Sequence, residues 1–151
     1  MTSNDELKQI ALSHFSTGFN CAQSTFGALA EKIDLEPTIA LKTATPFGGG
    51  ISHNGSICGT VSGALMGLGY HFGNTTPDSA VKYRNYEIGS LFLEKFRAQF
   101  GEVTCPGLLG LDIRIPEELA KVRELDLFNQ RCCQFISGAV EIAVQLIDEL
   151  N

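Results

Sequence analysis

The chain has 151 residues, a formal net charge of −6 and a pI near 5.0, and its length is that of one ordinary domain. Its 11 Lys and Arg residues form no basic run, which argues against nucleic acid and anionic membranes as partners. The hydrophobic fraction of 44% and the charged fraction of 19% exclude a disordered chain.

The N-terminal residues 1–8 are polar and lack the basic stretch and apolar core of a secretory signal. The most apolar window, residues 57–72, is shorter than the roughly 20 residues that a membrane span requires. The 5 cysteines are too few for a disulfide-framed secreted domain. We therefore expect a cytoplasmic protein that does not interact with membranes.

The first part of the chain shows three helical patterns. Ser3 and Glu6 form a capping-box signature for a helix that Gly18 ends. Asn20 is expected to cap a second helix over residues 21–33. Pro37 suits the first turn of a short third helix, which stops before the next proline.

A glycine-rich loop at residues 47–56 leads into an apolar helix predicted over residues 57–72. Within it, Gly59, Gly63 and Gly67 recur at every fourth position and share one face. A glycine inside a helix costs about 1 kcal/mol relative to alanine. Close packing against a neighbouring backbone is the expected compensation, and it places this helix at the centre of the fold.

The second half of the chain is predicted to contain a long helix starting near Asp78 and ending at Gly101, then a loop over residues 103–110. A short helix opens at Pro116, and a last helix runs from near Asn129 to the end. Strand-like alternation is absent. The sequence therefore predicts one all-α domain over residues 1–151, a bundle of about six helices around the glycine-containing helix.

The cysteines are dispersed, but several lie at predicted helix starts: Cys21, Cys58 and the pair Cys132–Cys133. Free N–H groups and the helix dipole favour a thiolate there, the form that attacks disulfides and binds metals. Cys105 lies in the predicted loop before Pro106, where it can turn inward. Simple core packing is the competing interpretation. Because close C-x₂-C pairs are lacking, any site has to be assembled by the fold.

Helix phase separates the two adjacent cysteines. Cys132 shares a face with Phe135 and Ala139, whereas Cys133 points about 100° away. We expect Cys132 to be the inward member. Cys133 remains a candidate resolving thiol or a core-filling residue.

The glycine-rich loop supplies accessory candidates. His53 is the best non-cysteine ligand candidate. Gly49 and Gly50 are expected to bring the backbone close to Cys58, with N–H groups available to sulfur or to an anion. The Gly-Lys-Ser/Thr sequence of a phosphate-binding loop is missing.

The order and spacing of these motifs resemble the C_GCAxxG_C_C family of redox-active proteins over nearly the whole chain. The resemblance rests on residues 18–24, 47–51 and 58–66, together with Cys105 and Cys132. It implies a small electron-handling protein similar to the non-haem part of split-Soret cytochromes, helical dimers associated with an iron–sulfur centre. By this resemblance, Cys21, Cys58, Cys105 and Cys132 would be the cluster or redox cysteines. It also implies a homodimer and a protein electron donor or acceptor.

Three functions follow as expectations. The first is a redox protein with an iron–sulfur cluster, two-iron by preference, on those four cysteines. The second is a metal-free dithiol/disulfide oxidoreductase that uses two of them. The third is an interaction module in which they bind structural zinc or pack in the core. Whether the protein is an enzyme stays open.

Overall fold

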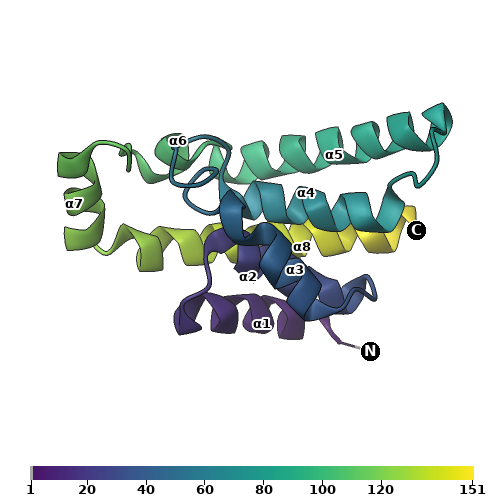
Figure 1. Cartoon of the computed structure of the whole chain (residues 1–151), viewed down its shortest axis with the longest axis horizontal. Helices are drawn as coiled ribbons and strands as arrows, with labels where there is room; N and C mark the ends of the chain where they lie inside the picture. The colour runs from purple at the N-terminus through teal and green to yellow at the C-terminus, as the bar shows by residue number, and fades with distance from the viewer. Residues whose placement is uncertain (1) are drawn as a thin grey trace.

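The computed structural model describes residues 2–151, which are 74% helical and contain no strand (Figure 1). The predicted all-α fold class is confirmed. The α-helices are α1 (Asn4–Thr17), α2 (Cys21–Lys32), α3 (Pro37–Ala44), α4 (Gly59–Phe72), α5 (Ser79–Phe100), α6 (Cys105–Leu109), α7 (Pro116–Glu124) and α8 (Cys133–Leu150). A 3₁₀ turn, η1 (Thr45–Phe47), follows α3, and a π-helical turn, η2 (Phe128–Cys132), precedes α8.

Side-chain caps fix where the first two helices begin. The Glu6 N–H donates to Ser3 Oγ at 3.2 Å, and Glu6 Oε2 accepts from the Ser3 N–H at 2.7 Å. Asn20 and Gln23 form the same reciprocal pair at the start of α2. These contacts satisfy N–H groups that have no partner inside the helix. Both predicted N-termini are confirmed.

Three boundaries differ from the sequence-based expectation, and the structure has eight α-helices where about six were expected. The predicted loop 103–110 contains the short helix α6, because Thr104 caps it and Pro106 occupies its first turn. The central helix α4 begins at Gly59, two residues later than expected, and its N-cap is Cys58. The last helix is preceded by the π-turn η2, which was not predicted.

The glycine face of α4 lies directly against α2, as predicted. A Cβ built at Gly63 would be 2.8 Å from the Ala22 carbonyl oxygen, and one at Gly67 would be 2.8 Å from Leu29 Cδ1. Helices α5 and α8 also pack against α4, so it lies inside the bundle (Figure 1). In the described part of the chain, no helix combines the length and the hydropathy needed to cross a membrane.

Two apolar clusters make up the interior. The larger one joins α1, α2, α4, α5 and α8, with Leu29, Phe92 and Ile136 among its buried side chains. The smaller one lies under α6 and α7 and includes Cys105 and Val122. Cys132 packs against both clusters. The seam between them is where the cysteines meet.

Candidate redox site

A cavity of about 470 Å³ lies at this seam, and its walls contain four of the five cysteines: Cys21, Cys58, Cys105 and Cys132. The glycine-rich loop 48–53 forms one side of the cavity, and aromatic side chains from α1, η2 and α8 form much of the rest. All five cysteines are free thiols. The structure therefore brings together the four cysteines singled out from the sequence and leaves Cys133 outside the cavity.

Cys21 occupies the first position of α2, directly after the cap Asn20. Its sulfur lies against α4 at Gly59, where a Cβ would overlap it. The backbone N–H groups of Gly49, Ala22 and Gly59 lie near this sulfur and help to lower the pKa of its thiol. Glycine at position 59 is thus a requirement of close approach, because any side chain would displace the sulfur.

The Cys21 and Cys58 thiols form a hydrogen-bonded pair with opposite acidities. The pKa of Cys21 is lowered to about 7, first by the hydrogen bond from the Cys58 thiol and then by the backbone N–H groups. The pKa of Cys58 is raised well above its usual range, because its proton is held by Cys21 and because it is buried. Cys21 is the group that ionises first, and Cys58 stays protonated beside it.

Backbone pairing between residues 56–58 and 103–105 fixes the positions of Cys58 and Cys105. The Cys58 N–H donates to the Val103 carbonyl at 2.8 Å, and the Cys105 N–H donates to the Ser56 carbonyl at 2.8 Å. Cys105 then begins α6 with Thr104 as its cap. Burial, followed by the charges of Cys21 and Asp112, raises the pKa of Cys105 to about 11.

Cys132 is the last residue of the π-turn η2 and Cys133 is the first residue of α8, and the two face different surroundings. Cys132 lines the cavity, and burial raises its pKa well above the usual range. Cys133 lies beside Leu12, Phe100 and Gln134 at a separate surface groove. This agrees with the helix phase expected for Cys132. The expectation that both lie at a free helix N-terminus is wrong, because the helical turn already begins at Phe128.

The glycine-rich loop contains an unbroken run of left-handed backbone. The φ angles of residues 49–53 are 64°, 70°, 66°, 50° and 65°, and three of these residues (Ile51, Ser52 and His53) are not glycine. Left-handed geometry costs a non-glycine residue about 1–2 kcal/mol. The loop compensates with internal hydrogen bonds, including Ser56 N–H to the Gly50 carbonyl at 2.8 Å. Backbone strain of this kind clusters at functional sites.

This loop contacts Cys21 and Cys105, and it lines the same cavity as Cys58. The Gly49 N–H reaches the Cys21 sulfur, and a Cβ at Gly50 would be 3.0 Å from Cys105 Cβ. His53 lines the outer part of the same cavity, with its ring near Gly49. The three accessory candidates therefore belong to the cavity wall, with His53 at an exposed position.

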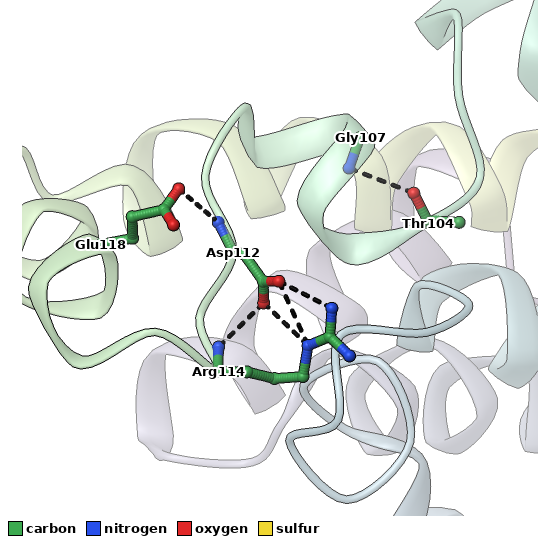
Figure 2. Close-up of polar contacts among 5 residues, drawn as sticks. All are labelled: Thr104, Gly107, Asp112, Arg114 and Glu118. Carbon is green, nitrogen blue, oxygen red and sulfur yellow. Dashed lines mark hydrogen bonds and ion pairs between the residues drawn. The ribbon is translucent and has the colours of Figure 1, made fainter.

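An ion pair beyond α6 braces the loop from outside (Figure 2). The Arg114 guanidinium donates to both carboxylate oxygens of Asp112, with Nη2 to Oδ2 at 2.7 Å. The Glu118 carboxylate accepts from the Asp112 N–H at 3.1 Å. A Cβ at Gly55 would be 3.1 Å from Arg114 Nε, so the pair packs directly on the loop. No sequence motif identifies this contact, because its partners meet only in the folded chain.

The cavity contains the thiol groups that a redox or metal centre uses, but they are not arranged as a metal-binding site. Within residues 2–151, no three His, Cys, Asp or Glu side chains are grouped closely enough to hold a metal ion. Two of the sulfurs, those of Cys21 and Cys58, interact directly through a side-chain hydrogen bond. Thiol–disulfide chemistry can therefore start from the interacting thiols of Cys21 and Cys58, whereas a metal ion held by three or more side chains would need these side chains to come closer together.

Comparison with protein families shows to which family the chain belongs. The sequence model of a family described as "Putative redox-active protein (C_GCAxxG_C_C)" matches residues 19–146. The chain belongs to the C_GCAxxG_C_C family. The match includes all four cavity cysteines of this C_GCAxxG_C_C protein and supports a redox function. No curated protein and no solved structure matches the chain significantly.

Proposed function

We propose that this protein is an electron-transfer protein whose centre is an iron–sulfur cluster held by Cys21, Cys58, Cys105 and Cys132. The observation that carries the proposal is the convergence of four cysteines, from four separate segments, on one cavity. A disulfide mechanism needs two sulfurs and no space between them. A cluster needs thiolate ligands, four in its usual form, and room for iron and sulfide.

The donor set fits such a group. Cysteine thiolates are the usual ligands of two-iron and four-iron clusters, and hydrogen bonds to their sulfurs tune the reduction potential. The loop N–H of Gly49 and the α4 N–H of Gly59 already point at the Cys21 sulfur. When bound, the cluster would supply one-electron chemistry. The chain would supply its ligands, its N–H donors and a largely apolar wall that limits access of water.

The fit requires movement of side chains, since three ligating groups are not yet closely grouped in the described residues. The Cys105 and Cys132 thiols have raised pKa values, so they are protonated near neutral pH without a metal. Metal binding displaces thiol protons. We therefore infer that loading releases protons and draws these two sulfurs inward.

A metal-free dithiol/disulfide oxidoreductase is the second candidate. The hydrogen-bonded pair Cys21–Cys58 favours it, because Cys21 has its pKa near 7 and Cys58 is a buried, protonated neighbour. A low-pKa thiolate attacks a substrate disulfide, and the mixed disulfide is then resolved by the second thiol. The substrate disulfide would be reduced to two thiols as the Cys21–Cys58 disulfide forms.

Metal and sulfide analysis of protein purified without oxygen tests the two proposals. A cluster gives visible absorbance, with iron and acid-labile sulfide in equal amounts. Colourless protein that gains a Cys21–Cys58 disulfide on mild oxidation supports the second candidate and contradicts the first. Stoichiometric zinc without sulfide would contradict both and restore a structural role for the cysteines.

As an electron carrier, the protein would exchange electrons with a donor or acceptor protein. We also propose that it binds a second copy of this chain to form a homodimer. Several large side chains are exposed, including Tyr70 on α4 and Tyr83 and Tyr86 on α5. Tyrosine is enriched in protein–protein interfaces. Sedimentation at several concentrations tests the homodimer, with Tyr86→Ser expected to weaken it.

A further inference from the structure

Thr60 is a fully buried polar residue (0% exposed) whose hydroxyl meets a sulfur. Its Oγ1 lies 3.1 Å from Cys58 Sγ. Two further buried hydroxyls behave differently: Ser24 donates to the Asn20 carbonyl at 2.7 Å and Thr25 to the Cys21 carbonyl at 2.8 Å. Those are ordinary contacts with the preceding helical turn.

The position of Thr60 in its helix explains the difference. It is the second residue of α4, which starts at Gly59, so no helical turn precedes it to offer a carbonyl. A buried hydroxyl without a partner is unfavourable by about 1–3 kcal/mol. The Cys58 sulfur, at the N-cap of the same helix, is the partner that the fold provides.

We propose that Thr60 is a positioning residue of the redox centre, which donates a hydrogen bond to the Cys58 sulfur and raises the reduction potential there. The inference rests on the proposed function, in which Cys58 acts as a thiolate. A thiolate has no proton to give, so the hydroxyl must be the donor in that state. A hydrogen bond to a ligand sulfur stabilises the more negative, reduced form of a cluster.

The test compares three variants of the complete chain after anaerobic loading with iron and sulfide. Thr60→Val keeps the shape of the side chain and removes the hydroxyl, whereas Thr60→Ser keeps the hydroxyl. Thr25→Val removes an equally buried hydroxyl that contacts a carbonyl instead of a sulfur. The readout is the midpoint potential from a redox titration monitored by visible absorbance.

We expect Thr60→Val to favour the oxidised form about three- to tenfold, a shift of roughly 30–60 mV to more negative potential for a one-electron couple. Thr60→Ser should stay near the wild-type potential, and so should Thr25→Val. An unchanged potential in Thr60→Val overturns the inference. An equal shift in Thr25→Val also overturns it, because the effect would then come from general loss of packing.

A second measurement keeps the test independent of the cluster. If the wild-type protein binds no cluster, the proposed function fails, and the hydrogen bond is then tested in metal-free protein by a double-mutant cycle. The effects of Thr60→Val and Cys58→Ala on the unfolding constant should be non-additive by at least about twofold. Additive effects would show that the hydroxyl and the sulfur do not interact, which overturns the inference by itself.

Discussion

Ile57 pairs with Thr104 through an isolated antiparallel bridge, and this contact joins the glycine-rich loop to α6. The residues that follow, Cys58 and Cys105, each donate a backbone N–H across the bridge at 2.8 Å. Main-chain atoms thereby fix the positions of two cavity cysteines that are far apart in the sequence, one on each side of the bridge. Substitutions that disturb the bridge should affect the site before they affect the distant helices.

Gly50→Ala should damage the site through this bridge. A Cβ at Gly50 would be 2.6 Å from the Ser56 nitrogen and 3.0 Å from Cys105 Cβ, in a residue with φ of 70°. Left-handed strain adds about 1–2 kcal/mol, and crowding adds roughly 1–3 kcal/mol. We expect a clear loss of unfolding free energy in urea and a loss of cofactor binding.

Gly101→Ala is the matched control for Gly50→Ala. Gly101 has φ of 86°, and none of the described atoms comes within 4 Å of its Cβ position outside its neighbours. It should therefore show only the left-handed strain and retain the cofactor. Equal destabilisation in the two variants would contradict the crowding at Gly50.

The close contact between α2 and α4 predicts that a larger residue at position 63 destabilises the fold. Gly63→Ala places a Cβ 2.8 Å from the Ala22 carbonyl, which belongs to the backbone of α2 and cannot rotate away. We expect destabilisation of about 1–3 kcal/mol from overpacking, measured by urea unfolding of cofactor-free protein. Gly69→Ala in the same helix meets none of the described atoms within 4 Å, so it should be neutral or stabilising by up to about 1 kcal/mol.

The adjacent cysteines should differ in function. Cys132→Ser removes a cavity sulfur and is expected to abolish iron and sulfide binding or redox cycling. Cys133→Ser changes a residue at a separate groove and should leave most of the cofactor in place. The measurement is iron and sulfide per chain after anaerobic loading. A result in which only Cys133→Ser destroys the centre would reverse the assignment, and loss in both variants would favour Cys133 as a resolving thiol.

Thiol reactivity should depend on pH differently at each cysteine. The pKa of Cys21 near 7 means that its thiolate fraction, and so its alkylation rate by iodoacetamide, rises from pH 6 and levels off above pH 8. The raised pKa of Cys105, about 11, keeps it unreactive through this range. Mass spectrometry of peptides from cofactor-free protein measures both rates. Faster alkylation of Cys105 than of Cys21 at pH 7 would contradict the proposed acidities.

The same lowered pKa makes a contribution to stability that depends on pH. Cys21 is more acidic in the folded chain than in the unfolded chain, so the folded state binds fewer protons between about pH 7 and 9. The ionisation of Cys21 adds its full contribution to the free energy of unfolding above the unfolded-state pKa near 9. This contribution is lost as the pH falls through 7. The Cys21→Ser variant should lack this part of the pH dependence in urea unfolding.

Local sequence signals predicted the features that depend on local contacts. The capping pair Ser3–Glu6 and the cap Asn20 act within one helical turn, and the close packing of Gly63 follows from a repeat within one helix. The cavity placement of Cys132 followed from helix phase. Each of these can be read from a few neighbouring residues.

The features that were missed depend on residues far apart in the sequence. The bridge between Ile57 and Thr104 lies directly before the starts of α4 and α6. No local sequence pattern predicts this bridge. The packing of Arg114 on Gly55 is of the same kind. Left-handed backbone at Ile51 runs against the preference of a β-branched residue, so only the surrounding fold explains it.

The four cavity cysteines come from segments spread between α2 and the start of α8, so nearly the whole chain must be in place before they meet. Contacts between such distant residues form slowly, because long loops have to close first. The unfolded chain therefore has no binding site to offer. A cofactor that binds only the finished fold stabilises it by mass action, so occupancy of the cavity and integrity of the fold become one equilibrium.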